Sequence, residues 1–258
     1  MPVVEQERDG FCAVIRINRP EKRNALSEEV LRGLVAAIGE ASDDTSVRGI
    51  VLTGSEEQFS TGVDLAEATQ VTSPELFEQA WDLWHSVTEA IESTGLPVVA
   101  AVNGYCLTGG LELALACDYR FAGRNARLGI TSAKIGSVAG IGGTQRLPRL
   151  IGRSRAKRLL FTGEFIGAET ALDIGLVDEL CDREKTVGAA IDLVHAMGGC
   201  APLSVAWHKQ AVNAGLETDL QEGLRLERSL CAQAFATEDR MEGMTAFLEA
   251  REPTFKAR

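Results

Sequence analysis

The sequence predicts an α/β protein in which helices cover strands that are buried on both faces. Three short segments, residues 11–18, 49–53 and 97–103, are nearly continuous in apolar residues. Such runs are typical of parallel strands that lie between two layers. Segments with helical character follow them, and this alternation is typical of the α/β class.

The first strand and the first helix have clear boundaries in the sequence. Residues 11–18 (FCAVIRIN) form a β-rich run that ends at an Arg-Pro pair. Ser27 has the residue type of a helix N-cap, and Glu28 and Glu29 follow it in what would be the first turn. These signals predict a helix that continues to about residue 42.

The next part of the chain continues the alternation. Residues 49–53 (GIVLT) are a short apolar strand, and Pro74 begins a helix that extends to Glu92. Residues 97–103 (PVVAAVN) are predicted to form a second buried strand, and residues 104–118 a helix that follows it.

The second half of the chain is predicted to be mostly helical. Its predicted helices are residues 153–162, 168–173, 186–197, 202–214, 219–236 and 238–251. No low-complexity tract or internal repeat divides the chain. We therefore expect a core of residues 1–200 and a helical C-terminal region, residues 201–258, that packs on the core or on a neighbouring subunit.

The charge of the chain disfavours nucleic acid as a partner. The formal net charge is −11, whereas a protein that binds the phosphate backbone needs a basic surface. The one basic stretch, residues 146–158 (RLPRLIGRSRAKR), is either a solvated helix face or a contact for an anion.

The sequence has none of the features of a membrane span or a targeting signal. No apolar run approaches the roughly 18 residues of a transmembrane helix. The start of the chain, MPVVEQERDG, is acidic and polar, unlike a secretory signal or an organelle transit peptide. We expect a cytoplasmic protein without a membrane partner.

The cysteines and histidines give no sign of a metal site. The six cysteines are scattered without a CxxC pair, and the three histidines have no ligand-like spacing. Because the cysteines have apolar or small neighbours, we expect reduced, packed thiols and no bound metal.

A first loop that could form part of a ligand site is residues 58–65 (QFSTGVDL). Gly62 permits a tight turn there, which would leave the amide N–H of Val63 free to donate. A plain strand-to-helix turn explains the same residues equally well.

A second loop, residues 103–112 (NGYCLTGGLE), leads to a carboxylate in unusual surroundings. Gly109 and Gly110 allow either a ligand to approach the backbone or the helix to pack closely against the sheet. Glu112 then has a leucine on each side, whereas a solvent-facing glutamate in a first helical turn usually has polar neighbours. This pattern favours a functional acid or base over a structural role.

A third loop, residues 128–147 (LGITSAKIGSVAGIGGTQRL), contains five glycines. It lacks the Gly-Lys-Ser/Thr of a phosphate loop and the glycine spacing of a dinucleotide fingerprint. We expect it to shape the wall of a pocket, with a helix that begins near Gly143.

Five segments of the chain resemble the enoyl-CoA hydratase/isomerase, or crotonase, family. They are NRPEKRNAL (18–26), QFSTGVDL (58–65), PVVAAVNGYCLTGGLELALACDYRFA (97–122), IGGTQRLPRLIG (141–152) and FATEDRMEGMTAFLEAREPTFK (235–256). The resemblance covers nearly the whole chain. It implies a crotonase-like spiral of repeated ββα units with a helical C-terminal region, acyl-CoA thioester substrates, and assembly into a homotrimer or hexamer. Coenzyme A enters as part of the substrate, and no other cofactor is implied.

The chemistry shared by that family is stabilisation of a thioester enolate by two backbone amides. By resemblance, the donors here are the N–H groups of Val63 and Gly109, and Glu112 is the glutamate that activates the attacking water. A partly desolvated carboxylate should have a raised pKa, which suits proton exchange near neutrality. The resemblance also implies residues that bind the substrate and its CoA: Arg23, Asn24, Ala25, Thr61, Gly62, Asp64, Leu65, Gly110, Phe255 and Lys256. Phe255 and Lys256 belong to a tail that closes over CoA in the same or an adjacent subunit.

One position departs from the family's pattern. Hydratases usually carry a second glutamate in the third loop, and the matching residue here is Ser132. A serine hydroxyl can hold a water but cannot exchange a proton near neutral pH as a carboxylate does. Isomerases of the family commonly depend on a carboxylate at the same position. His85 and Glu89, which share one helix face, could substitute, but a surface or core-edge role explains each of them better.

We therefore expect an enoyl-CoA hydratase-type lyase that adds water to a 2-enoyl-CoA with a single glutamate. The serine leaves two alternatives open. One is another crotonase-family reaction, such as decarboxylation, hydrolysis or isomerisation of an acyl-CoA. The other is a non-catalytic acyl-CoA-binding protein.

Overall fold

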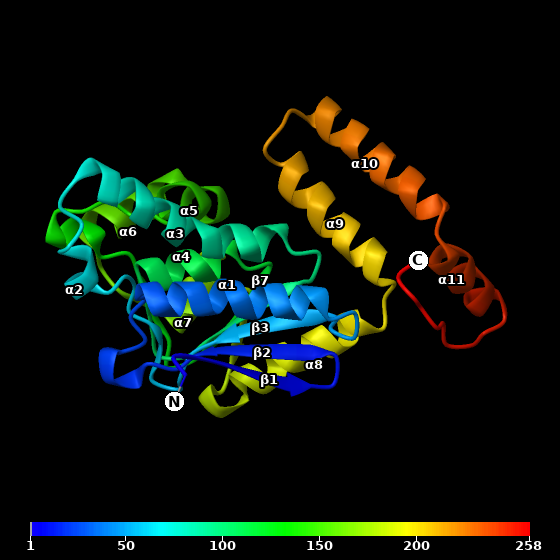
Figure 1. The fold of residues 1–258 in the computed structure, drawn as a ribbon, viewed down its shortest axis with the longest axis horizontal. Helices are drawn as coiled ribbons and strands as arrows, with labels where there is room; N and C mark the ends of the chain where they lie inside the picture. The colour runs from blue at the N-terminus through cyan, green and yellow to red at the C-terminus, as the bar shows by residue number, and fades with distance from the viewer. Residues whose placement is uncertain (1) are drawn as a thin grey trace.

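Two sheets form the framework of the protein (Figure 1), whose computed structural model describes residues 2–258. Met1, the first residue of the predicted core, lies outside the described residues. The larger sheet contains, in spatial order, β1 (Val4–Asp9), β2 (Cys12–Ile17), β3 (Gly49–Thr53), β5 (Val98–Val102), β7 (Tyr119–Gly123) and β10 (Glu179–Cys181). The smaller sheet contains β4 (Gln58–Ser60), β6 (Tyr105–Leu107), β8 (Arg127–Gly129) and β9 (Ile166–Gly167).

Three consecutive stretches of the chain each give one strand to each sheet. They contribute β3 with β4, β5 with β6, and β7 with β8, and the equivalent strands lie parallel and side by side. Leu52 is opposite Ala100, for example, and Ala100 is opposite Arg120. This arrangement stacks the connecting loops on one another, and it confirms the predicted α/β spiral of ββα units.

The helices cover the sheets and then extend beyond them (Figure 1). They are α1 (Glu28–Asp43), α2 (Leu65–Ala68), α3 (Pro74–Ser93), α4 (Gly109–Ala116), α5 (Gly143–Ile151), α6 (Arg153–Thr162), α7 (Ala168–Asp173), α8 (Thr186–Gly198), α9 (Pro202–Gly215), α10 (Leu220–Phe235) and α11 (Glu238–Leu248). Helix α1 begins as predicted, because Ser27 Oγ accepts a hydrogen bond from Val30 N at 3.3 Å.

The prediction of one helix over residues 104–118 is wrong at its start. Residues Tyr105–Leu107 form β6, and α4 begins only at Gly109. Three residues are too few to show a strand periodicity, and the strand forms because β4 and β8 supply hydrogen-bonding partners on either side. Strand β1 was likewise not predicted, since its sequence VEQERD is polar and lies at the sheet edge.

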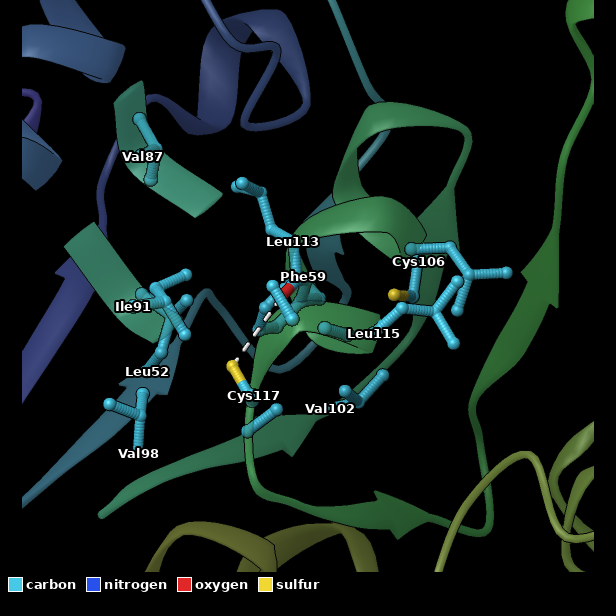
Figure 2. Close-up of a cluster of buried hydrophobic side chains, with 14 of the residues drawn as sticks. Leu52, Phe59, Val87, Ile91, Val98, Val102, Cys106, Leu113, Leu115 and Cys117 are labelled. Carbon is cyan, nitrogen blue, oxygen red and sulfur yellow. Dashed lines mark hydrogen bonds between the residues drawn. The ribbon is translucent and has the colours of Figure 1, made fainter. Parts of the chain in front are cut away.

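Helix α4 lies inside the main hydrophobic core, among the side chains drawn in Figure 2. All of its residues are buried, and Leu111 and Leu113 are fully enclosed. Phe59 from β4 and Ile91 from α3 belong to the same cluster. An otherwise apolar helix therefore carries Glu112 into the protein interior.

Helices α9, α10 and α11 lie beside the core rather than within it (Figure 1). Lys209 fixes α9 to the core: its Nζ donates to Ile91 O at 2.7 Å and to Leu96 O at 2.9 Å, and it lies 2.9 Å from Asp118 Oδ2. These helices also expose large apolar side chains: Val212, Leu216, Leu220, Leu224, Phe235, Met241, Met244, Phe247 and Leu248. An exposed apolar surface of this extent is typical of a protein–protein interface.

Within residues 2–258, no single helix combines the length and the apolar composition that crossing a membrane requires. One pair, Arg183–Gly198 and Pro202–Gly215, meets both criteria only when its two helices are taken together, and it is bent by 111°.

The prediction of packed thiols is correct for some of the cysteines and wrong for others. Cys12, Cys106 and Cys117 are buried, and burial raises the pKa of Cys117 to about 12. Cys200 and Cys231 are exposed, because the segments that carry them lie in the less buried C-terminal part of the chain.

Lys209→Met should lower the free energy of unfolding by about 3 kcal/mol, because the change leaves Asp118 without its ammonium partner and removes a donor from two carbonyls. Urea unfolding followed by circular dichroism measures this value. Lys185→Met, which removes only an exposed ion pair with Asp182, is the matched control and should leave the midpoint nearly unchanged. Equal shifts for the two variants would contradict the anchoring role of Lys209.

Candidate functional site

A short bridge to Leu26 fixes the backbone around Val63. Leu26 N donates to Gly62 O at 2.8 Å, and Asp64 N donates to Leu26 O at 3.0 Å. Since the residues on either side of Val63 make these bonds, the N–H of Val63 points away from Leu26. Within the described chain this N–H donates to no acceptor.

Gly62 brings the Val63 amide up to the start of α4. Its φ of +97° is a conformation that side chains rarely allow. A Cβ at this position would also lie 3.0 Å from both Gly109 N and Leu107 O. Glycine is therefore required here by conformation and by close approach together.

A second free amide belongs to Gly109, the first residue of α4. The first N–H groups of a helix have no partner within it, and that of Gly109 finds none elsewhere in residues 2–258. A Cβ on Gly109 would lie 3.4 Å from Val63 N, so the two amides border the same small space. Two donors arranged in this way can stabilise negative charge on a single oxygen.

Gly110 serves the packing of α4 rather than the space beside the amides. A Cβ there would lie 2.5 Å from Ser60 O and 2.8 Å from Ser60 Cβ, so the approach of α4 to β4 requires glycine. This differs from the predicted contact of Gly110 with substrate. Close packing of the helix against the sheet therefore explains Gly110, whereas approach of a ligand to the backbone explains Gly109.

Glu112 is only 1% exposed, and one of its oxygens is held by the third loop. Oε1 accepts hydrogen bonds from Ile141 N and Gly143 N, both at 2.8 Å. Oε2 accepts none from the described residues, and it is not fully buried. The carboxylate is therefore fixed through one oxygen and has the other available for chemistry.

Burial is the main influence on the proton affinity of Glu112. It raises the pKa of the carboxyl above its ordinary value of 4.5, and the N–H groups of Gly143 and Ile141 oppose part of this shift. The nearby charges of Arg146 and His85 also lower the pKa. The net effect is a carboxyl that exchanges protons closer to neutral pH than an exposed glutamate does.

Arg146 supports the loop that holds Glu112. Its guanidinium donates to both carboxylate oxygens of Glu92, each at 2.6 Å, and to Ile141 O at 3.0 Å. A side chain on Gly142 would overlap this guanidinium. This role was not predicted, because Arg146 stands at the start of a basic stretch that suggested only a solvated helix face or an anion contact. Gly142, directly before α5, was the available signal that a side chain folds back on this turn.

Ser132 is buried at the start of a short 3-10 helix, Ser132–Ile135. Its hydroxyl makes no hydrogen bond within residues 2–258. The preceding Thr131 bonds to Thr108, the residue before Gly109, with 2.9 Å between the hydroxyl oxygens. The structure therefore brings the third loop against the second, as the prediction of one shared site requires.

A cavity of about 350 Å³ opens beside Val63. Its apolar lining includes Leu26, Leu31, Val63, Leu76, Leu83 and Trp84. Trp81 is 37% exposed and stacks on His85, with 4.1 Å between ring centroids, and Glu89 is exposed. Helix α3 thus borders the cavity through Trp84, whereas His85 lies at the core edge, as predicted.

The side chain of Asn24, a residue predicted to bind CoA, points into the protein. It is fully buried, and its Nδ2 donates to Gln58 O at 2.9 Å while its Oδ1 accepts from Arg19 N at 2.8 Å. Both carboxylate oxygens of Asp64 are also hydrogen-bonded within the protein. Its Oδ2 pairs with Arg19 at 2.6 Å, which lowers the pKa of the carboxyl, and its Oδ1 caps α2 through Ala66 N. These two side chains hold the first loop in place.

The other residues predicted to bind CoA from this part of the chain lie close together. Thr61 Oγ1 donates to Arg23 O at 3.1 Å, so the two segments run side by side. The side chains of Arg23 and Leu65 are exposed, and Ala25 is half-buried. These residues are accessible to a ligand that approaches the Val63 amide.

Phe255 and Lys256 lie in the C-terminal tail, which packs against α11. Helix α11 lies apart from the core that carries the three loops (Figure 1). Asp239 is buried and holds the tail through both oxygens, which accept from Lys256 N at 2.7 Å and Ala257 N at 2.8 Å. The Phe255 ring packs against Gly243. The structure therefore does not bring this pair to the site within one subunit.

In the described part of the chain, residues 2–258, no three His, Cys, Asp or Glu side chains are grouped to hold a metal ion.

Glu112→Gln should stabilise the fold at neutral pH, because the amide oxygen can still accept both N–H groups while the buried charge is lost. The raised pKa means that protonation stabilises the folded wild type fully below pH 4.5 and that this stability is lost as the pH rises through the folded-state pKa. The advantage of the variant should therefore grow with pH. Urea unfolding between pH 4 and pH 8 measures it, with Glu89→Gln as an exposed control. An advantage that shrinks as the pH rises would show that Glu112 is not penalised by burial.

Comparisons with known proteins agree with this geometry. Residues 7–258 match the family Enoyl-CoA hydratase/isomerase. The chain is 39% identical to the short-chain-enoyl-CoA hydratase of Clostridium acetobutylicum over 95% of this chain and 94% of the relative. It is 40% identical to the 2,3-dehydroadipyl-CoA hydratase of Escherichia coli over 97% of each. The crystal structure of an enoyl-CoA hydratase from Bacillus anthracis superposes with a TM-score of 0.94 at 35% identity, covering 99% of this chain and 100% of that one. The chain therefore belongs to the enoyl-CoA hydratase/isomerase family.

Proposed function

We propose that this chain is an enoyl-CoA hydratase-type lyase, which adds water across the C2–C3 double bond of a 2-enoyl-CoA. The observation that carries the proposal is the meeting of two free amides, those of Val63 and Gly109, in the same site as a buried glutamate, Glu112. The names of relatives at 38–40% identity, which include crotonyl-CoA hydratase and short-chain-enoyl-CoA hydratase, support this substrate class.

In the proposed reaction the thioester oxygen lies between the two amides. Glu112 Oε2 takes a proton from water as the water oxygen bonds to C3. The electron pair of the double bond moves toward the thioester oxygen, and the resulting enolate is stabilised by Val63 N–H and Gly109 N–H. The proton then passes from Glu112 to C2, so that no proton is gained or lost overall. One donor of this kind contributes on the order of 3–4 kcal/mol in enzymes.

The raised pKa of Glu112 supports the double task of accepting a proton and returning it. A general base works best when its pKa lies near the working pH. Since Ile141 N and Gly143 N fix Oε1, proton transfer at Oε2 does not require the carboxyl to reorient.

Ser132 limits the rate in this proposal. Its unpaired hydroxyl can hold a water, but it does not supply the second proton-exchanging group that a carboxylate would. We therefore expect slower hydration than in an enzyme with two carboxylates, or an activated substrate. The same serine favours a second candidate, namely another acyl-CoA reaction that needs one carboxylate, such as decarboxylation or hydrolysis.

The binding of CoA completes the proposal. Arg23, Thr61 and Leu65 lie on the accessible side of the first loop, where the nucleotide half of CoA would pass. Phe255 and Lys256 would close over it from an adjacent subunit of a homotrimer or hexamer, and the exposed apolar side chains of α9, α10 and α11 support such an assembly. Coenzyme A acts only as part of the substrate. The cytoplasmic location remains a prediction.

Wild-type protein incubated with crotonyl-CoA should remove the conjugated enoyl absorbance. Glu112→Gln should lower kcat on the order of 10²–10⁴-fold, because it removes the proton-exchanging group, and Ser132→Glu should raise kcat because it supplies a second one. Glu89→Gln is the control and should match the wild type.

Full activity in Glu112→Gln would rule out the proposed mechanism. Tight binding of crotonyl-CoA by the wild type without turnover would point instead to a non-catalytic acyl-CoA-binding protein.

A further inference from the structure

Thr108 has a backbone conformation that is costly for its residue type. Its φ of 48° and ψ of −114° lie outside the regions that a β-branched residue adopts without strain. Four other non-glycine residues in the described chain have a positive φ, and none of the four is β-branched: Arg23, Asn24, Ala250 and Ala257. Strain of this kind persists only where surrounding contacts hold it.

The backbone of Thr108 is tied on both sides. Its N–H donates to Gly129 O at 2.8 Å, and its C=O accepts from Glu112 N at 2.9 Å. The first bond joins it to β8, which leads into the third loop, and the second joins it to the helix that carries the glutamate. The conformation of Thr108 therefore sets the direction in which α4 begins.

The side chain of Thr108 lies where the three loops meet. Its Oγ1 accepts from Thr131 N at 3.2 Å and lies 2.9 Å from Thr131 Oγ1. On the other side, Thr108 Cβ is 3.2 Å from the position that a Cβ on Gly62 would occupy. One threonine thus touches the first loop, begins the second and is hydrogen-bonded to the third, next to Ser132.

A glycine at position 108 would adopt this backbone without strain, but it would lose the contacts to Thr131 and the first loop. Threonine at position 108 therefore provides contacts that a glycine would not, in exchange for the backbone strain. Position 108 directly precedes the free amide of Gly109, and Thr131 directly precedes Ser132. The hydroxyl pair consequently connects the amide that would bind the thioester oxygen to the segment of the third loop that carries Ser132.

We propose that Thr108 is a positioning residue that sets the distance between the Gly109 amide and the Ser132 segment through its hydrogen bonds to Thr131. The inference rests on the proposed function, because it assigns a catalytic purpose to that distance. Thr108 acts on the reacting end of the substrate and not on the part that binds CoA. Substitutions at Thr108 should therefore change kcat and not KM. Misplacement of a catalytic group by about 1 Å can reduce a rate on the order of 100-fold.

The first test compares Thr108→Gly, Thr108→Ser and Thr131→Val with the wild type, using crotonyl-CoA as substrate. Thr108→Gly should lower kcat about tenfold or more, keep KM within about twofold, and keep or raise the melting temperature because strain is relieved. Thr108→Ser retains the hydroxyl and should stay close to the wild type. Thr131→Val keeps the backbone N–H but loses the hydroxyl, so it should have an intermediate kcat.

The control for a purely structural effect is Thr94→Ala. Thr94 is also buried, and its hydroxyl lies 2.8 Å from Ser42 Oγ, between the C-terminal ends of α1 and α3 and outside the three loops. This variant should lose thermal stability and keep its kcat. A wild-type kcat in Thr108→Gly, or a Thr108→Ser variant as impaired as the glycine variant, would overturn the proposal.

A second readout separates this inference from the proposed reaction. Acetoacetyl-CoA forms an enolate without any addition of water, and two converging amides should stabilise it and increase its enolate absorption band. The band should be present with wild type and Thr108→Ser and weakened at least severalfold with Thr108→Gly, even if the wild type hydrates no enoyl-CoA. Equal bands in all three proteins, or no band with the wild type, would overturn the role assigned to Thr108.

Discussion

The bridge between Leu26 and the residues that flank Val63 is the constraint on which the site depends. Because Gly62 O and Asp64 N are both bonded to Leu26, the N–H of Val63 has to face the start of α4. The start of a helix leaves its own first amides free, so the Gly109 N–H is available at the same place. The spiral makes this meeting possible, since it stacks successive loops at one edge of parallel strands. Neither amide needs a special side chain, only glycines that allow the two segments to approach.

Burial of the Glu112 carboxylate is the main free-energy cost that the site imposes on the folded protein. An unpaired carboxylate in an apolar helix would be strongly destabilising, and two backbone N–H groups offset part of that cost. Those N–H groups are themselves held by Arg146, which binds the carbonyl of Ile141 and the carboxylate of Glu92. A series of hydrogen bonds thus runs from Glu92 through Arg146 and the third loop to Glu112. It keeps one carboxylate oxygen of Glu112 fixed and leaves the other unbonded, as proton transfer to a substrate requires.

Periodicity and end signals predicted most of the regular structure. The strand Gly49–Thr53 and the helices Arg153–Thr162 and Ala168–Asp173 have the predicted boundaries, and the burial of Glu112 was evident from its leucine neighbours. Short strands such as Tyr105–Leu107 were not predictable, because they exist only through pairing with distant segments. The inward role of Asn24, the loop support by Arg146 and the strain at Thr108 also depend on contacts between loops far apart in sequence. Local residue patterns carry no information about such contacts.

A crystal structure of the protein with a bound, non-hydratable acyl-CoA tests most directly whether the two amides bind one oxygen beside Glu112. The thioester oxygen should lie about 2.7–3.1 Å from both Val63 N and Gly109 N, with Glu112 Oε2 facing C2 and C3 of the acyl chain. A thioester oxygen that contacts neither amide, or an acyl chain on the far side of α4 from Glu112, would contradict this arrangement.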